Sequence, residues 1–189
     1  MSRNLIVLTL IVVILGCLIG FIAFRIHQRS VISQGRLLFE QGEYQEVIDN
    51  LGPDVQGTSY AADERMLVAR SQYRLGRYQE AQETLQPLLV FGQEDPRAIA
   101  LSGWLFLEEG SFLKAQSKFI MLSDLEKKAE AEAGLAGVAL LRSEGRRKSE
   151  LNEAEIHIRE AIKLDQSIPE AYLVRSELKT IRNDYEAAI

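Results

Sequence analysis

The sequence predicts an all-α protein, with an N-terminal transmembrane helix followed by an α-solenoid of about four and a half helix-pair repeats. Three observations support this fold class. Glycines recur 34 residues apart at Gly42, Gly76 and Gly110, and an aromatic residue follows each by two positions. Residues 5–24 carry no charge, and no segment alternates apolar and polar residues as a strand would. A fixed period of this length is typical of helix pairs that stack into a solenoid.

The first predicted element is a membrane anchor over residues 5–24. About 20 helical residues cross a hydrocarbon core of about 30 Å. Arg3 precedes the segment, and Arg25, His27 and Arg29 follow it as basic flanks. The competing interpretation is a cleaved signal peptide, whose apolar part is normally only about 7–15 residues long and ends at small residues. No such site lies near Phe24, which favours an uncleaved anchor spanning residues 1–29 with its flanks.

Cys17 raises an alternative for this segment. Residues 14–17 read Ile-Leu-Gly-Cys, which faintly resembles the lipidation motif of bacterial lipoproteins, and would make the protein an outer-membrane lipoprotein lipidated at Cys17. The residues after Cys17 stay apolar, which favours a small side chain inside a membrane helix. Gly16 and Gly20 have the spacing that permits close helix approach, so a homodimer is a further alternative.

The charge and cysteine content of the remaining chain limit which partners it can bind and which cross-links it can form. Residues 30–189 contain 19 Lys and Arg against 27 Asp and Glu, so their net charge is −8. Nucleic-acid binding is therefore not expected, because it draws on clustered cations. This part contains no cysteine and can form no disulfide. Arg25 and Arg29 follow the anchor, and only Arg3 precedes it. By the positive-inside rule, this small excess favours a cytoplasmic domain on a single-pass inner-membrane protein.

Residues 30–189 are predicted to form the solenoid, with repeats near 30–60, 61–95, 96–128 and 129–168 and a partial repeat near 169–189. The helix pairs are expected near 30–41 and 44–52, 61–75 and 78–91, 97–109 and 112–123, 129–144 and 152–165, with a last helix near 169–182. Pro53 and Pro87 should shorten or kink second helices. Pro96 and Pro169 should open first helices, where proline lacks no hydrogen bond.

Three copies carry a family resemblance. Residues 35–48 read GRLLFEQGEYQEVI, residues 69–82 read ARSQYRLGRYQEAQ, and residues 103–116 read GWLFLEEGSFLKAQ. A partial copy, DYEAAI, closes the chain. These segments resemble the tetratricopeptide repeat, in which a first helix, a glycine turn, an aromatic residue and an alanine in the second helix follow one another. Together with the predicted anchor over residues 5–24, the resemblance implies a membrane-anchored bacterial scaffold that binds proteins.

The repeat-packing positions have physical roles. Gly42, Gly76 and Gly110 should adopt the positive φ that ends a helix. The aromatic residues should fill the angle between the two helices, and the small residues should let these helices cross closely. These residues are Tyr44, Tyr78 and Phe112, and then Ala81, Ala115, Ala154 and Ala188.

The fourth copy departs from the pattern. Its first helix should end at Gly145, and four extra residues fall within Arg146–Leu151 before the second helix restarts at Asn152. We expect Glu155 to form a capping pair with Asn152. The basic residues of the insertion indicate either a solvated turn or a contact for an acidic partner or anionic lipid.

The resemblance also implies that the first helices line a concave groove that binds the partner. The residues expected there are Ile32, Arg36, Phe39, Met66, Arg70, Tyr73, Arg74, Trp104, Leu107, Glu108, Leu135 and Arg142. Aromatic, Met and Arg side chains are enriched in interface anchors. Trp104 is the strongest single candidate, because it is the only tryptophan of the chain.

No catalytic, metal or cofactor site is expected. His27 and His157 are the only histidines, and neither has a partner at metal-ligand spacing. The expected function is a non-enzymatic scaffold that binds protein components and supports assembly of an envelope complex. The alternative is a constitutive structural subunit of a large membrane complex. Because Leu173, Leu178 and Ile181 form an apolar face near the end of the sequence, we also expect a continuing chain or a partner to cover it.

Overall fold

The computed structural model describes residues 18, 20, 31–55, 62–90, 94–144 and 147–187. The described residues form helices and turns, and no strand occurs among them. The chain divides into two compact units, Met1–Ser71 and Gln72–Ile189, and the boundary falls within helix α3, Ala62–Arg74. The expectation of an all-α chain is confirmed for the described part.

The first unit contains a helical stretch over residues 31–41, then α2, Tyr44–Val55, and the start of α3. Its core is a cluster of Val47, Leu51, Leu67 and Val68, which are 8% exposed or less. These residues come from both α2 and α3. The predicted first helix pair is therefore present, and the first helix of the next pair, α3, covers its apolar face.

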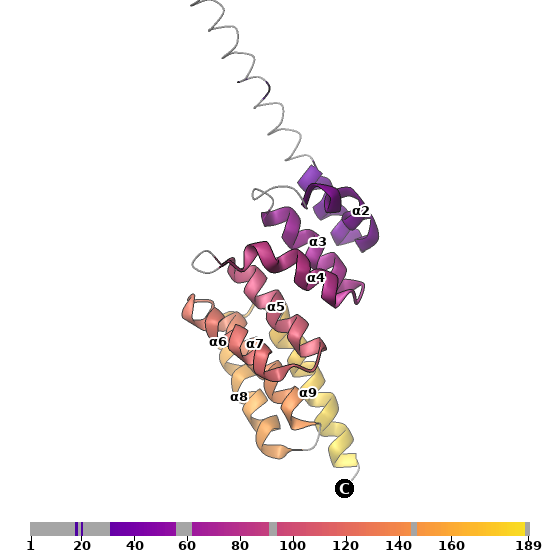
Figure 1. Ribbon diagram of the computed structural model, residues 1–189. Helices are drawn as coiled ribbons and strands as arrows, with labels where there is room; N and C mark the ends of the chain where they lie inside the picture. Colours follow the sequence, from indigo (N-terminus) through magenta and orange to yellow (C-terminus); the bar gives the residue numbers. More distant parts are fainter. Residues whose placement is uncertain are drawn as a thin grey trace, which may run out of the picture. The chain divides into compact units, whose positions relative to one another are not determined.

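The second unit contains the remaining helices (Figure 1). In order they are α4 (Tyr78–Leu85), the 3₁₀ turn η1 (Gln86–Leu88), α5 (Pro96–Glu108), α6 (Phe112–Asp124), α7 (Lys128–Ser143), α8 (Lys148–Leu164) and α9 (Pro169–Ala187). Helix α5 packs beside α6, α6 beside α7, and α7 beside both α8 and α9. Consecutive helices thus pack as pairs, as the 34-residue period predicts.

The turn glycines behave as expected. Gly42, Gly76 and Gly110 have φ angles of 83°, 73° and 72°. In the fourth copy, α7 ends at Ser143, and Glu144 adopts the left-handed conformation with φ 49°. Glu144 stands 34 residues after Gly110, so the period continues although the glycine does not. Gly145, where we expected the helix to end, lies outside the described residues.

Three of the four prolines lie at helix ends. Pro96 and Pro169 open α5 and α9, as predicted. The side chain of Asp95 caps α5 by accepting a hydrogen bond from the backbone N–H of Arg97 at 2.9 Å. Pro87 shortens α4, which gives way to a 3₁₀ turn after Leu85. Pro53 instead lies inside α2, which continues to Val55 and is longer than we expected.

Residues 148–151 of the insertion in the fourth copy are helical, which corrects our expectation that the second helix restarts only at Asn152. Helix α8 begins at Lys148, four residues before the predicted start at Asn152, and Arg147 precedes it with an extended backbone. The extra residues therefore add a first turn to α8. This turn forms because Leu151, 4% exposed, packs against the buried face of α7 and adds apolar burial.

Helix α9 also differs from the expectation. We predicted a helix near 169–182, then a turn and the start of a fifth second helix, but α9 runs without a break to Ala187. The reason is that Asn183 occupies the place of the turn glycine, and asparagine tolerates the ordinary helical conformation. The structure therefore describes four helix pairs and one long single helix. Ala188 lies outside the described residues.

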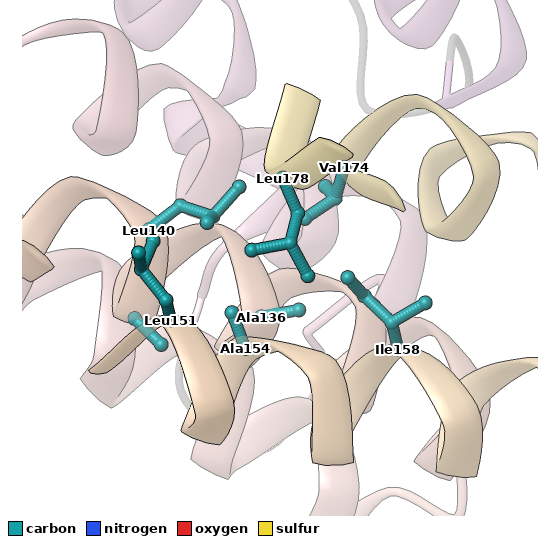
Figure 2. Packing of buried hydrophobic residues seen from close by; sticks show 8 residues of the cluster. Ala136, Leu140, Leu151, Ala154, Ile158, Val174 and Leu178 are labelled. Carbon is teal, nitrogen blue, oxygen red and sulfur yellow. The ribbon is translucent and has the colours of Figure 1, made fainter. Parts of the chain in front are cut away.

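The apolar face of α9 is covered within the chain. Val174 and Leu178 are 4% and 3% exposed, and they meet Ile158, Ala154 and Ala136 in one cluster (Figure 2). Ile181 packs against the same cluster. The expectation that Leu178 and Ile181 need another chain to cover them is wrong, because α7 and α8 already cover them. Leu173 alone of the three is on the surface, at 65% exposed.

Small residues set the distance between neighbouring helices. A Cβ added to Gly103 of α5 would lie 2.6 Å from Cζ of Phe119. A Cβ added to Gly134 of α7 would lie 2.1 Å from Cδ1 of the same phenylalanine. The fully buried ring of Phe119 on α6 is thus held between two glycines. Ala81, Ala115 and Ala154 are also fully buried, as predicted for the positions where helices cross.

The predicted membrane anchor has no structural counterpart in the described part of the chain. Over the ranges given above, no helix combines the length and hydropathy that crossing a membrane requires. The anchor over residues 5–24 lies outside the described residues apart from Leu18 and Gly20, and so do Cys17 and Gly16.

Candidate functional site

The predicted groove residues follow the 34-residue period. They fall into four columns, each at one register of successive first helices, and only Leu135 does not fit. The columns are Ile32 and Met66, then Arg36, Arg70 and Trp104, then Phe39, Tyr73 and Leu107, and finally Arg74, Glu108 and Arg142. Because a column repeats once per helix pair, each set of residues occupies equivalent positions on its helices.

Most apolar members of this set are core residues rather than surface anchors. Met66 is only 4% exposed, so a partner cannot reach it, and its assignment to the groove is corrected. Ile32 and Phe39 are half-buried against the cluster of the first unit. Leu107 and Leu135 are half-buried against the cluster that contains Phe119. The helices bury these side chains because burial of apolar area is the main favourable term in packing.

Trp104 also packs against the cluster that contains Phe119. Its ring meets the ring of Phe119 edge-on, with centroids 5.4 Å apart and planes at 65°. It also covers Gly137, where an added Cβ would lie 3.1 Å from the indole. Removing Trp104 would therefore open a cavity between α5, α6 and α7. A loss of binding after such a change would report folding and not contact with a partner.

The exposed members of the groove set are charged: Arg36, Arg70, Arg74 and Glu108. Arg36 lies 3.4 Å from Asp63 and, with Ile32 and Glu40, lines an open hollow of about 730 Å³ in the first unit. Among the described residues, neither Arg70 nor Arg74 forms an ion pair. The half-buried Arg142 lies 3.7 Å from Glu153.

Two of the predicted groove residues, Tyr73 and Glu108, meet directly, and Tyr78 also binds Glu108. The hydroxyl of Tyr73 on α3 donates to Oε1 of Glu108 at 3.0 Å, and the hydroxyl of Tyr78 on α4 donates to Oε2 at 3.4 Å. The two tyrosine rings are 5.8 Å apart. Glu108 is the last residue of α5. Three consecutive helices thus contribute one side chain each to a carboxylate held by two phenols.

The protonation of this cluster follows from its surroundings. Burial first, and the charge of Glu108 second, raise the pKa of the Tyr73 hydroxyl well above its ordinary value. The charge of Glu108 is the main cause that raises the pKa of Tyr78. Both hydroxyls therefore remain protonated donors at neutral pH.

Tyr78 was assigned only a packing role from the sequence, yet it also orients Glu108. The period carried a signal for this pairing. Phe39 and Tyr44 pack edge-on with centroids 5.2 Å apart, and Tyr73 and Tyr78, each 34 residues later, repeat the pairing. The third copy breaks the series because Leu107 replaces the first aromatic residue, and Phe112 is left 39% exposed.

Of the basic residues in the insertion, the structure describes Arg147 and Lys148. Arg147 lies 3.4 Å from Glu144 and 3.5 Å from Glu150, so its charge is locally balanced. Lys148 is exposed at the start of α8, and Arg146 lies outside the described residues.

His157 meets Glu132 at 2.6 Å across α8 and α7. Within the described part of the chain, no three His, Cys, Asp or Glu side chains are placed to hold a metal ion.

Comparison with known proteins identifies the fold. No protein-family model and no curated protein sequence matches the chain. A solved structure does: the crystal structure of a tetratricopeptide repeat protein from Parabacteroides merdae ATCC 43184, with a TM-score of 0.64 over 84% of this chain. The chain has a tetratricopeptide-repeat fold.

The likeness is one of fold, because the two sequences are only 20% identical. The chain spans 60% of the length of that tetratricopeptide protein. The resemblance inferred from the repeated Gly, aromatic and Ala residues is confirmed at the level of the fold. The roles of individual surface residues remain predictions.

Proposed function

We propose that this protein is a non-catalytic scaffold that binds a protein partner through the exposed side chains of its first helices. The observation that carries the proposal is the 34-residue repetition within the second unit, which places exposed Arg74 and Glu108 and half-buried Arg142 at one register of α3, α5 and α7. Repetition of one helix face along a solenoid makes an extended surface suited to a polypeptide. The charged character of these residues favours recognition by electrostatic complementarity.

The location is also a proposal. The uncharged residues 5–24, between Arg3 and Arg25, support a single membrane-spanning anchor in a bacterial inner membrane. The scaffold would hold its partner at the membrane and support assembly of an envelope complex, with a slight preference for a cytoplasmic domain. Mass spectrometry of the mature protein tests the anchor, because a chain that starts at Met1 or Ser2 and stays in carbonate-washed membranes rules out lipidation at Cys17.

Site-specific photo-crosslinking tests the binding surface. A photoreactive phenylalanine analogue replaces Arg74 of α3 in the full-length chain, which is expressed in bacterial cells and irradiated. The control places the same analogue at Glu83 of α4, which is also exposed but lies on a second helix. We expect crosslinked proteins from position 74 and few from position 83. Equal products from both positions, or products from position 83 alone, would contradict the proposed surface.

A constitutive subunit of a large membrane complex would give a different result. Its partners would co-purify with the full-length chain in fixed stoichiometry after detergent extraction. A scaffold that captures partners through charged side chains should release them when the salt concentration rises, because ions screen exposed charges.

A further inference from the structure

Glu108 is placed where the fold gains little from its charge. It is the last residue of α5, and α5 has no basic residue in its last turn. The C-terminus of a helix carries a partial negative charge, so a carboxylate there is unfavourable. Arg74 and Arg142, at the equivalent register of α3 and α7, have the sign that a helix C-terminus favours. The stability of α5 therefore gives no reason for a carboxylate at this position.

The carboxylate is nevertheless held in a defined orientation. Tyr73 donates to one of its oxygens at 3.0 Å and Tyr78 donates to the other at 3.4 Å. A carboxylate has about four lone-pair sites for hydrogen bonds, and the two phenols use only two. Glu108 is exposed, so the remaining sites face solvent. The side chain is thus oriented in advance and still able to accept a donor.

No cation of the protein completes this arrangement. Among the described residues, no lysine or arginine forms an ion pair with Glu108. Arg74 follows Tyr73 directly in α3, and its charge acts on the Tyr73 hydroxyl, but it does not reach Glu108. Arg142 lies beside Glu153 instead. The chain as a whole is acidic, with a net charge of −5, which attracts a basic partner at longer range.

We propose that Glu108, oriented by Tyr73 and Tyr78, is the subsite that receives a basic side chain of the partner protein, with arginine favoured over lysine. This inference rests on the proposed function, since it names the chemistry that the binding surface recognises. The planar guanidinium presents paired N–H donors that match the two oxygens of a carboxylate. The neighbouring tyrosine rings add a surface over which a cation is attracted.

The test selects peptides from a randomised 12-residue display library on the full-length chain, and measures each recovered peptide, labelled with fluorescein, by anisotropy. The decisive variant is Glu108→Gln, which keeps the shape and removes the charge. Glu109→Gln is the matched control, because Glu109 is exposed, adjacent and loses the same charge. Each peptide is also made with its arginines replaced by citrulline, a neutral analogue of the same shape.

We expect the recovered peptides to be enriched in arginine, and Glu108→Gln to weaken their binding about fivefold, as loss of one exposed ion pair does. Glu109→Gln should change binding less than about twofold, because only long-range charge is lost. The citrulline peptides should bind wild type and Glu108→Gln equally. Tyr73→Phe should weaken the arginine peptides by an intermediate factor, because the carboxylate then loses one of its two fixed donors.

Two results overturn the inference. One is a selection that returns no peptides enriched in basic residues, and the other is equal binding to the Glu108→Gln and Glu109→Gln variants. Crosslinking of the same peptides separates this failure from that of the proposed function. If the peptides crosslink from position 74 yet ignore Glu108→Gln, the subsite fails and the binding surface stands. If they crosslink only from position 83, the binding surface itself fails.

Discussion

Replacing Gly134 with alanine should destabilise the protein, although alanine is the better helix former. Gly134 lies inside α7, where an added Cβ would stand 2.1, 2.2 and 2.4 Å from three ring atoms of Phe119. Ordinary contact begins at 3.4 Å, so the ring would have to recede by more than about 1 Å. The ring has little room to do so, because Gly103 of α5 and the ring of Trp104 also pack against it.

The magnitude follows from two opposing effects. Overpacking a filled core costs about 1–3 kcal/mol, and the upper end applies here because three rigid ring atoms are involved. The better helix propensity of alanine offsets about 1 kcal/mol. The free energy of unfolding should therefore fall by about 2 kcal/mol, which corresponds to a melting temperature lower by about 4–8 °C for a chain of this size.

Urea denaturation of the full-length chain measures this change. Trp104 is the only tryptophan and packs against Phe119, so its fluorescence reports on the same part of the core. Gly52→Ala is the control, since its added Cβ would meet nothing closer than 3.8 Å and alanine should stabilise α2 by about 0.5–1 kcal/mol.

A double mutant separates the clash from other causes. In a Phe119→Leu background the ring is gone, so Gly134→Ala should cost less than about 0.5 kcal/mol beyond the cost of Phe119→Leu itself. If Gly134→Ala alone leaves the protein as stable as wild type, or stabilises it as Gly52→Ala does, the packing of Phe119 between the two glycines is refuted.

Three further predictions concern single sites. Glu126, with φ 63°, is strained for a residue with a side chain, so Glu126→Gly should raise the unfolding free energy by about 0.5–1 kcal/mol in urea titrations. Asp95→Ala should lower it by about 1 kcal/mol, whereas Asp95→Asn should keep the cap of α5, and thermal melts compare the two. The pKa of Tyr73 is raised in the folded state, so its hydroxyl loses its proton more easily in the unfolded chain. The contribution of this hydroxyl to the free energy of unfolding should therefore be fully present below about pH 10 and be lost as the pH rises further. Tyr73→Phe should make the alkaline decline of the melting temperature shallower.

The sequence alone determined the repeat and most of its helix boundaries. Gly42, Gly76 and Gly110 predicted left-handed turns because only glycine adopts positive φ without strain, and all three have that conformation. Pro96 and Pro169 marked the starts of α5 and α9 because φ and the missing N–H restrict proline to such positions. These are local effects, which depend on a residue and its nearest neighbours in the chain.

Tertiary packing decided what the local signals left open. Residues 148–151 of the insertion in the fourth copy form the first turn of α8 because Leu151 is buried against α7, which no spacing within the segment reveals. Helix α9 continued through Asn183 because asparagine permits a turn without requiring one. Burial depends on which helices lie opposite, and sequence periodicity gives only the face of a helix, not what covers it.

The same limit governed the candidate site. The resemblance to the tetratricopeptide repeat implied that Met66, Tyr73 and Trp104 line a groove. The neighbouring helices decided that Met66 is core, that Trp104 packs on Phe119, and that Tyr73 holds Glu108. The carboxylate and its two phenols come from α3, α4 and α5, up to 35 residues apart in the chain. Their meeting is a product of helix packing, because no interaction along a single helix extends beyond about four residues.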